Sequence, residues 1–352
     1  MNKTEQTWFS ELLDNVNIQT TSHIKKFFSN NKFVVLSQDE KDGYINREIM
    51  FITGPYSICR AKNKLKINDK VRDWTKNKPY IPFGKFFENS NLTRTLISKK
   101  ENFRKYKVSG EIEAVIEETF YSMTEVNVSA FCGIVQADDK DISTAKEFQK
   151  QNQGDFYLFA ESYPFSRSKI QKNILKEGAI YGGYGKNGPE TFFSQGKKSV
   201  KINKSTLFAN ESMAENYVPK VIKHKGLNIV VLICYDLLNP RLSYFLSKQN
   251  IDLIFIPAMI PKKDIPKWKK FLYVRGQEIQ TPIILTSNED RRKICSCLTL
   301  SYEATEEIVL ESKKPSVIKL KIGKEKLRKS PKVHWSWLLR NSVFGPFADD
   351  FN

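Results

Sequence analysis

Cysteines, histidines and long apolar runs are all scarce in this sequence. Among 352 residues there are three histidines and five cysteines, and the cysteines are Cys59, Cys132, Cys234, Cys295 and Cys297. An odd number of cysteines in a chain of this length argues against a disulfide framework and for reduced thiols, and so for a cytoplasmic protein. The first twenty residues lack the apolar core of a secretory signal. The longest apolar run, near Asn228–Cys234, is too short for a membrane span, so we expect none.

Acidic residues are also few beside basic ones. The chain has 39 Asp and Glu against 57 Lys and Arg, a net charge of +18, and the largest share of the excess lies in residues 127–323. Such a charge suits an anionic small-molecule substrate or a nucleic acid. Lysine dominates over arginine, and the basic excess is spread along the chain. The competing interpretation is therefore that the amino-acid composition has drifted toward lysine and that the charge serves no binding partner.

The residue composition and the hydrophobic pattern divide the chain into three parts. Residues 1–126 mix helical and strand-like segments without a motif that carries chemistry, and they predict an α+β region of unknown role. Residues 127–323 alternate apolar β-type runs with helical segments, which is typical of an α/β sandwich with buried strands. Residues 324–352 form a basic and then aromatic tail.

Three segments of the first part carry more specific expectations. Apolar residues on one side predict an amphipathic helix over Glu5–Phe28. The basic segment Lys62–Lys78 favours a solvated loop or helix. The segment Glu111–Phe120 favours a helix.

In the second part, three reactive side chains stand at the ends of apolar strand-like runs. Glu161 follows Phe-Tyr-Leu-Phe-Ala, Lys204 follows Val-Lys-Ile-Asn, and Cys234 follows Ile-Val-Val-Leu-Ile. Side chains at strand ends lie at the rim of a sheet, where α/β folds build active sites. We therefore expect the three side chains to lie together.

A glutamate, a lysine and a cysteine at one site suit the transfer of an acyl group held on nitrogen. A cysteine thiol is mostly protonated at neutral pH and needs a base to become a good nucleophile. An enclosed carboxylate can take that proton and later return it to a leaving amine. A lysine ammonium can stabilise the oxyanion that develops on an attacked carbonyl. Such a set needs no metal or organic cofactor.

These segments, together with others in the same order, resemble the nitrilase or carbon–nitrogen hydrolase superfamily. The resemblance covers residues 127–323. It runs through a first strand ending in Gln136, then Leu-Phe-Ala-Glu, Lys-Ser-Thr-Leu-Phe, Leu-Ile-Cys-Tyr-Asp, the strand Asp252–Ala258 and an Arg-Gly-Gln-Glu helix. It implies an α-β-β-α sandwich, an amidase-type hydrolase of small amides or nitriles, and a homodimer that uses the C-terminal tail.

The resemblance also implies roles for single residues. Cys234 would be the nucleophile, Glu161 the general base, and Lys204, rather than the nearby Lys201, the oxyanion stabiliser. The Tyr235 backbone N–H, directly after the nucleophile, would be the second oxyanion donor.

Other family positions are less clear in this chain. A second glutamate follows the lysine in the family; Glu211 fits that spacing best, and Glu215, in Ala-Glu-Asn-Tyr-Val-Pro, competes with it. Where the family has Phe-Pro-Glu after the nucleophile motif, this chain has Asn-Pro-Arg, so Arg241 favours an anionic substrate. The basic run Arg291–Lys293 either favours an anionic substrate in the same way or forms a solvated loop.

Three functions stay open. The first is an active amidohydrolase with a Cys thioester intermediate. The second is an N-acyl transferase on the same scaffold, in which an amine replaces water as the acceptor. The third is a catalytically inactive nitrilase-like effector whose basic surface binds nucleic acid. We expect no metal site, because Cys295 and Cys297 alternate on one strand without partner ligands and favour packing.

Overall fold

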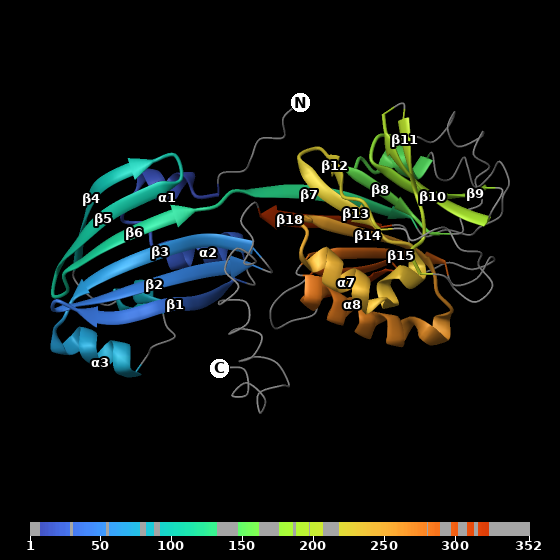
Figure 1. Ribbon diagram of the computed structural model, residues 1–352. Helices are drawn as coiled ribbons and strands as arrows, with labels where there is room; N and C mark the ends of the chain where they lie inside the picture. The colour runs from blue at the N-terminus through green and yellow to red at the C-terminus, as the bar shows by residue number, and fades with distance from the viewer. Residues whose placement is uncertain are drawn as a thin grey trace, which may run out of the picture. The chain divides into compact units, whose positions relative to one another are not determined.

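The computed structural model describes residues 8–28, 31–53, 56–77, 82–87, 92–131, 147–161, 176–185, 188–196, 198–206, 218–279, 281–288, 297–301, 308–312 and 316–323. They divide into two compact units (Figure 1). The first unit holds the chain up to Thr124 together with the residues from Lys321, and the second holds Glu125–Leu320. No helix in these ranges is long and apolar enough to cross a membrane.

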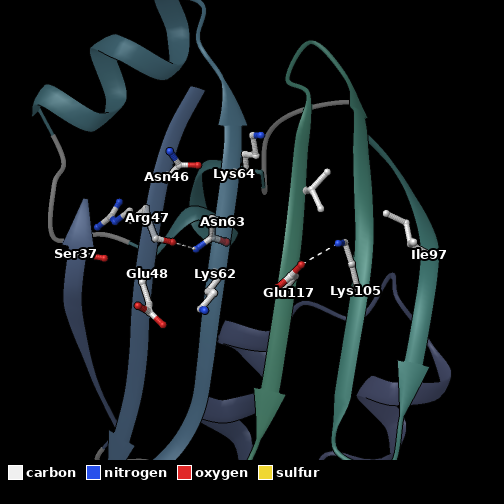
Figure 2. A pocket seen from close by; sticks show the side chains of 11 residues that line it. Ser37, Asn46, Arg47, Glu48, Lys62, Asn63, Lys64, Ile97, Lys105 and Glu117 are labelled. Atoms are coloured by element: carbon white, nitrogen blue, oxygen red, sulfur yellow. Dashed lines mark hydrogen bonds and ion pairs between the residues drawn. The ribbon is translucent and has the colours of Figure 1, made fainter. Parts of the chain in front are cut away.

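The first unit is built on an antiparallel six-stranded sheet with the order β1-β2-β3-β6-β5-β4. Its elements are α1 (Ser10–Asp14), α2 (Thr20–Phe27), β1 (Lys32–Lys41), β2 (Tyr44–Thr53), β3 (Tyr56–Lys66), α3 (Asp69–Asn77), α4 (Phe83–Phe86), β4 (Leu92–Lys100), β5 (Phe103–Gly110) and β6 (Ala114–Phe120). Burial alternates residue by residue along β6 and the second half of β3, so one face of the sheet is packed and the other faces solvent. Trp74 of α3 and Phe83 of α4 pack on the covered face with Leu65 and Ile116. In Figure 2 the side chains of Glu48, Lys62 and Lys64 stand on the open face, whereas Arg47 and Asn63 are buried.

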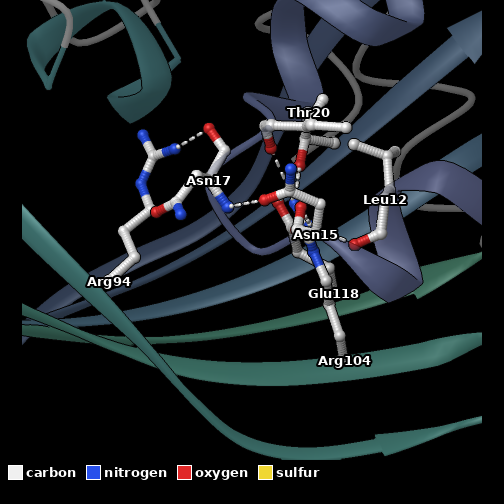
Figure 3. Close-up of polar contacts among 8 residues, drawn as sticks. Leu12, Asn15, Asn17, Thr20, Arg94, Arg104 and Glu118 are labelled. Atoms are coloured by element: carbon white, nitrogen blue, oxygen red, sulfur yellow. Dashed lines mark hydrogen bonds and ion pairs between the residues drawn. The ribbon is translucent and has the colours of Figure 1, made fainter.

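A buried arginine ties the N-terminal helices to this sheet (Figure 3). Arg104 Nε lies 2.6 Å from Glu118 Oε2, and the two side chains are 1% and 6% exposed. The same guanidinium donates to the carbonyl oxygens of Leu12 and Asn15 and to the hydroxyl of Thr20. A buried charge needs such a full set of partners because no water is there to replace them.

Two sequence predictions for this unit are wrong. The described part of Glu5–Phe28 forms α1 and α2 instead of one helix, since Asn15 is extended and its carbonyl binds Arg104. The segment Glu111–Phe120 contains the strand β6, because its apolar residues recur with period two and not with helical spacing. Of the basic segment Lys62–Lys78, for which the sequence predicts a loop or helix, Lys62–Lys66 belong instead to the strand β3, and Asp69–Asn77 form the helix α3.

The second unit contains two six-stranded sheets with the orders β11-β10-β9-β8-β7-β18 and β12-β13-β14-β15-β16-β17. The strands of the first are β7 (Met123–Phe131), β8 (Phe156–Phe159), β9 (Ala179–Gly185), β10 (Gly188–Gln195), β11 (Lys198–Ile202) and β18 (Ser316–Gly323). Those of the second are β12 (Ile222–His224), β13 (Leu227–Val231), β14 (Leu253–Met259), β15 (Ile283–Asn288), β16 (Cys297–Ser301) and β17 (Ile308–Ser312). Strands β7, β8 and β9 are parallel, as are β13, β14 and β15.

The two sheets pack face to face and helices cover the outside of the second (Figure 1). The ring centroids of Phe156 on β8 and Phe255 on β14 are 5.0 Å apart. The helices are η1 (Cys234–Leu238), α7 (Pro240–Ser247), η2 (Lys262–Asp264) and α8 (Ile265–Ile279). Beside the first sheet, the helical residues 147–151 lead to Asn152, whose carbonyl accepts from Ser129 of β7. These layers confirm the predicted α/β class, with an α-β-β-α sandwich and an additional α+β region.

Candidate active site

Glu161 lies two residues beyond β8, at the point where the ends of the facing sheets meet. Its backbone N–H donates to the carbonyl of Ala258 on β14 (3.4 Å), and its side chain is buried. Gly182 of β9 packs against the Glu161 backbone so closely that a Cβ there would collide with the Glu161 carbonyl oxygen. The absence of a side chain at this glycine therefore sets the position of Glu161.

Lys204 lies two residues beyond β11 and reaches Glu161. Lys204 Nζ is 3.2 Å from Glu161 Oε1, and the two side chains are 12% and 7% exposed. Because the pair is largely shielded from water, its charges act strongly on neighbouring groups. Lys201, the competing lysine, is exposed on β11.

Cys234 begins η1 directly after the buried run that continues β13. Its backbone φ is +45°, in the left-handed region that costs a residue with a Cβ roughly 1–2 kcal/mol. Its Sγ lies 3.9 Å from the Met259 carbonyl oxygen. Burial raises the pKa of this thiol, Glu161 raises it further, and Lys204 opposes them. The resting thiol is therefore protonated.

One carboxylate joins the cysteine turn to the segment that carries Lys204. Asp236 Oδ1 accepts the backbone N–H groups of Ser205 (2.8 Å) and Thr206 (2.6 Å), and its Oδ2 accepts that of Ile233 (2.9 Å). Burial raises the pKa of Asp236 to about 6, against the three hydrogen bonds and the Lys204 charge, which lower it. Asp236 is thus placed to position two reactive groups at once.

Helix α8 secures the far end of η1. Arg275 Nε donates to the Leu237 carbonyl (3.0 Å) and Nη2 to the Leu238 carbonyl (3.3 Å). Its Nη1 also pairs with Glu278 (2.6 Å) on the same helix. The Arg-Gly-Gln-Glu segment of the sequence therefore holds the backbone that follows the cysteine.

Two further residues expected at the site lie on η1 and α7. Tyr235 is half-buried and its ring meets Trp268 of α8 edge to face, with centroids 6.1 Å apart. Arg241 is exposed in the first turn of α7, where its backbone N–H donates to the side chain of Asn239 (3.0 Å). Within the described part of the chain, no contact joins the Arg241 side chain to the Lys204–Glu161 pair.

The remaining expected residues, Glu211, Glu215 and the run Arg291–Lys293, lie outside the described residues. Sequence reasoning missed Gly182 and the positioning contacts of Asp236. The run Tyr-Gly-Gly-Tyr-Gly around Gly182 carries a signal, since a glycine inside a strand often marks a close backbone approach. Where residues are described, no group of three or more His, Cys, Asp or Glu could hold a metal ion.

No protein-family model matches the chain, and no curated protein matches its sequence. Solved structures that resemble part of it are found. A CN-hydrolase superfamily protein from Xanthomonas campestris, with an arsenic adduct in its active site, is 16% identical with a TM-score of 0.43 over 65% of this chain and 98% of that one. A nitrilase-superfamily amidase variant from Nesterenkonia is 12% identical with a TM-score of 0.43 over 60% and 97%. Another variant of that amidase, with the acetamide moiety of fluoroacetamide added covalently at its active-site cysteine, is 11% identical with a TM-score of 0.44 over 60% and 97%.

These neighbours are CN-hydrolase and nitrilase superfamily proteins. The sequence motifs of residues 127–323 resemble the same superfamily.

Proposed function

We propose that this chain is a carbon–nitrogen hydrolase that cleaves a non-peptide C–N bond through a thioester on Cys234. The observation that supports the proposal is the shielded Lys204–Glu161 ion pair next to a buried, protonated thiol. Removing two charges from water costs stability, and such pairs with perturbed neighbours are concentrated at functional sites. A cysteine that served only for packing would need neither partner.

In the first half-reaction Glu161 takes the thiol proton as Cys234 Sγ attacks the carbonyl carbon. The electron pair of the C=O bond moves to oxygen, where the Lys204 ammonium and the Tyr235 backbone N–H stabilise it. When the C=O bond re-forms, the C–N bond breaks and the amine leaves with the proton from Glu161. The acyl group remains on sulfur as a thioester.

In the second half-reaction Glu161 takes a proton from water while the water oxygen attacks the thioester. The C–S bond breaks, the acid is released, and the proton returns to the Cys234 sulfur. Glu211 is the second glutamate in this proposal, and Glu215 is its alternative.

The substrate is proposed to be a small amide or nitrile with an anionic group. The chain's charge of +18 and the exposed Arg241 support that sign of charge. A homodimer formed through residues 324–352 belongs to the same proposal.

Ammonia release from a panel of small amides, with and without a carboxylate on the acyl group, tests the activity. We expect turnover by the wild-type chain, none by Cys234→Ala, and an acyl adduct on Cys234 detected by mass spectrometry of peptides. Cys59→Ala is the matched control, because it removes a buried thiol from the other unit. Turnover that survives Cys234→Ala would refute the assignment. A product that forms only when an amine is added would indicate acyl transfer instead of hydrolysis.

A further inference from the structure

The open face of the N-terminal sheet carries a line of positive charge. On β3 every second residue from Arg60 to Lys66 is basic and exposed, which gives Arg60, Lys62, Lys64 and Lys66 on one face. With a rise of about 3.4 Å per residue, successive cations stand about 7 Å apart and the line is about 20 Å long. Because β3 lies third in the order of six strands, this line runs along the middle of the sheet.

The acidic residues beside this line are already paired. Glu48 on β2 and Glu117 on β6 are in register with Lys62. Glu48 binds Arg60 (2.5 Å) and Glu113 binds Lys66 (3.1 Å), so two cations of the line are already compensated, and Glu117 binds Lys105 (2.9 Å). In the described part of the chain Lys62 has no ion pair, so its charge is available to a ligand.

The next row across the sheet holds lysines without acids between them. Asn46 on β2, Lys64 on β3, Val115 on β6 and Lys107 on β5 follow one another in register. Lys64 Nζ lies over the ring of Tyr44 on the same face, 4.4 Å from its centroid, and that ring stands beside Lys66 in register. An aromatic ring therefore stands at one end of the line of cations.

The face is also hollowed. A groove of about 440 Å³ is lined by residues of all six strands, from Ser37 on β1 to Ile97 on β4 (Figure 2). Lys62, Lys64 and Lys105 line it together with the carboxylates of Glu48 and Glu117, each of which is ion-paired to a basic side chain. A groove of this kind fits a narrow chain laid into it better than the flat surface of a bilayer.

We propose that this face binds single-stranded nucleic acid. Lys62 and Lys64, the two members of the line without an ion pair among the described residues, stand about 7 Å apart, which matches the spacing of successive phosphates along an extended strand. The Tyr44 ring offers a surface on which a base can stack, and only an unpaired strand exposes base faces for that contact. This site is separate from the proposed hydrolase chemistry, and neither depends on the other.

Fluorescence anisotropy of the full chain with a labelled 20-nucleotide single strand at about 50 mM salt tests the proposal. We expect Lys62→Ser/Lys64→Ser to weaken binding about tenfold and to reduce the slope of log K against log[salt] by about 1.4, since each phosphate contact on a single strand contributes about 0.7. Tyr44→Leu should weaken binding without changing that slope, because stacking releases no counterions.

The matched control is Lys267→Ser/Lys270→Ser, which removes two exposed lysines from α8. If this control weakens oligonucleotide binding equally, binding depends on the net charge of the chain and not on this face, and the proposal is overturned. Absence of binding at about 50 mM salt would overturn it too. So would a duplex of the same sequence that binds as well as the single strand. Binding to phosphatidylserine vesicles that Lys62→Ser/Lys64→Ser abolishes, without binding of the oligonucleotide, would assign the face to membranes. Circular dichroism checks that each variant is folded.

Discussion

Replacing Asp236 with asparagine tests how the chain holds its reactive groups together. The carboxylate is 1% exposed and accepts three backbone N–H groups from two segments of the chain. The Asp236→Asn amide has one accepting oxygen, so at least one of those N–H groups loses its partner. We expect the Lys204 segment and the cysteine turn to separate slightly, and the alkylation rate of Cys234 by iodoacetamide to change.

The stability effect depends on pH, and its sign follows from the pKa. Burial raises the pKa of Asp236 from 3.8 to about 6 in the folded chain, so the folded state holds this proton more tightly than the unfolded state does. The contribution to the free energy of unfolding is therefore complete below pH 3.8 and lost as the pH rises through about 6. A shift of about two units corresponds to about 3 kcal/mol, of which about 2 kcal/mol falls between pH 4.5 and 7.5.

Calorimetry of the wild-type chain and of Asp236→Asn at about pH 4.5 and 7.5 measures this contribution. Because the amide does not titrate, the stability of the variant relative to the wild type should rise by about 2 kcal/mol over that range. For a unit of about 200 residues this is a relative change in Tm of about 4–8 °C. Asp73→Asn, at an exposed position of α3, measures the effect of losing any one carboxyl. A difference between Asp236→Asn and the wild type that is the same at both pH values would refute the reasoning.

Three further changes test other contacts. Cys234→Ala should leave Tm within a few degrees of the wild type and reduce amide turnover to background; residual turnover would exclude the thioester route. Gly182→Ala should reduce turnover about a hundredfold, because displacement of Glu161 by about 1 Å is enough for such a loss; an unchanged kcat would contradict the close approach seen in the structure. Arg104→Leu should cost about 3–5 kcal/mol in denaturant unfolding, since Glu118 stays buried without its partner. The Arg104→Leu/Glu118→Leu double variant should recover part of that loss, and no recovery would argue against the buried charge as the cause.

The α/β class of the second unit could be predicted because its core strands are continuous apolar runs. A strand such as β14 is buried over nearly its whole length, and only a strand covered on both faces has that composition. Glu161 and Lys204 lie 43 positions apart in the sequence, and their proximity follows from strand ends that meet at one edge. Their catalytic roles remain predictions.

Contacts that depend on tertiary geometry could not be read in the same way. Asp236 accepts hydrogen bonds from backbone N–H groups about thirty residues away. Every residue except proline has such a group, so the sequence does not indicate which of them Asp236 binds. The error over Glu111–Phe120 has a different cause. Its four glutamates favour a helix locally, whereas the sheet selects the alternation of Ala114, Ile116 and Phe120 on its packed face.

The left-handed backbone of Cys234 has a consequence for engineering. Its strained backbone opposes folding. A screen that rewards only heat resistance would therefore enrich glycine at this position. Its most robust survivors would be those that had lost the nucleophile, so any programme to stabilise this chain has to select for turnover at every round.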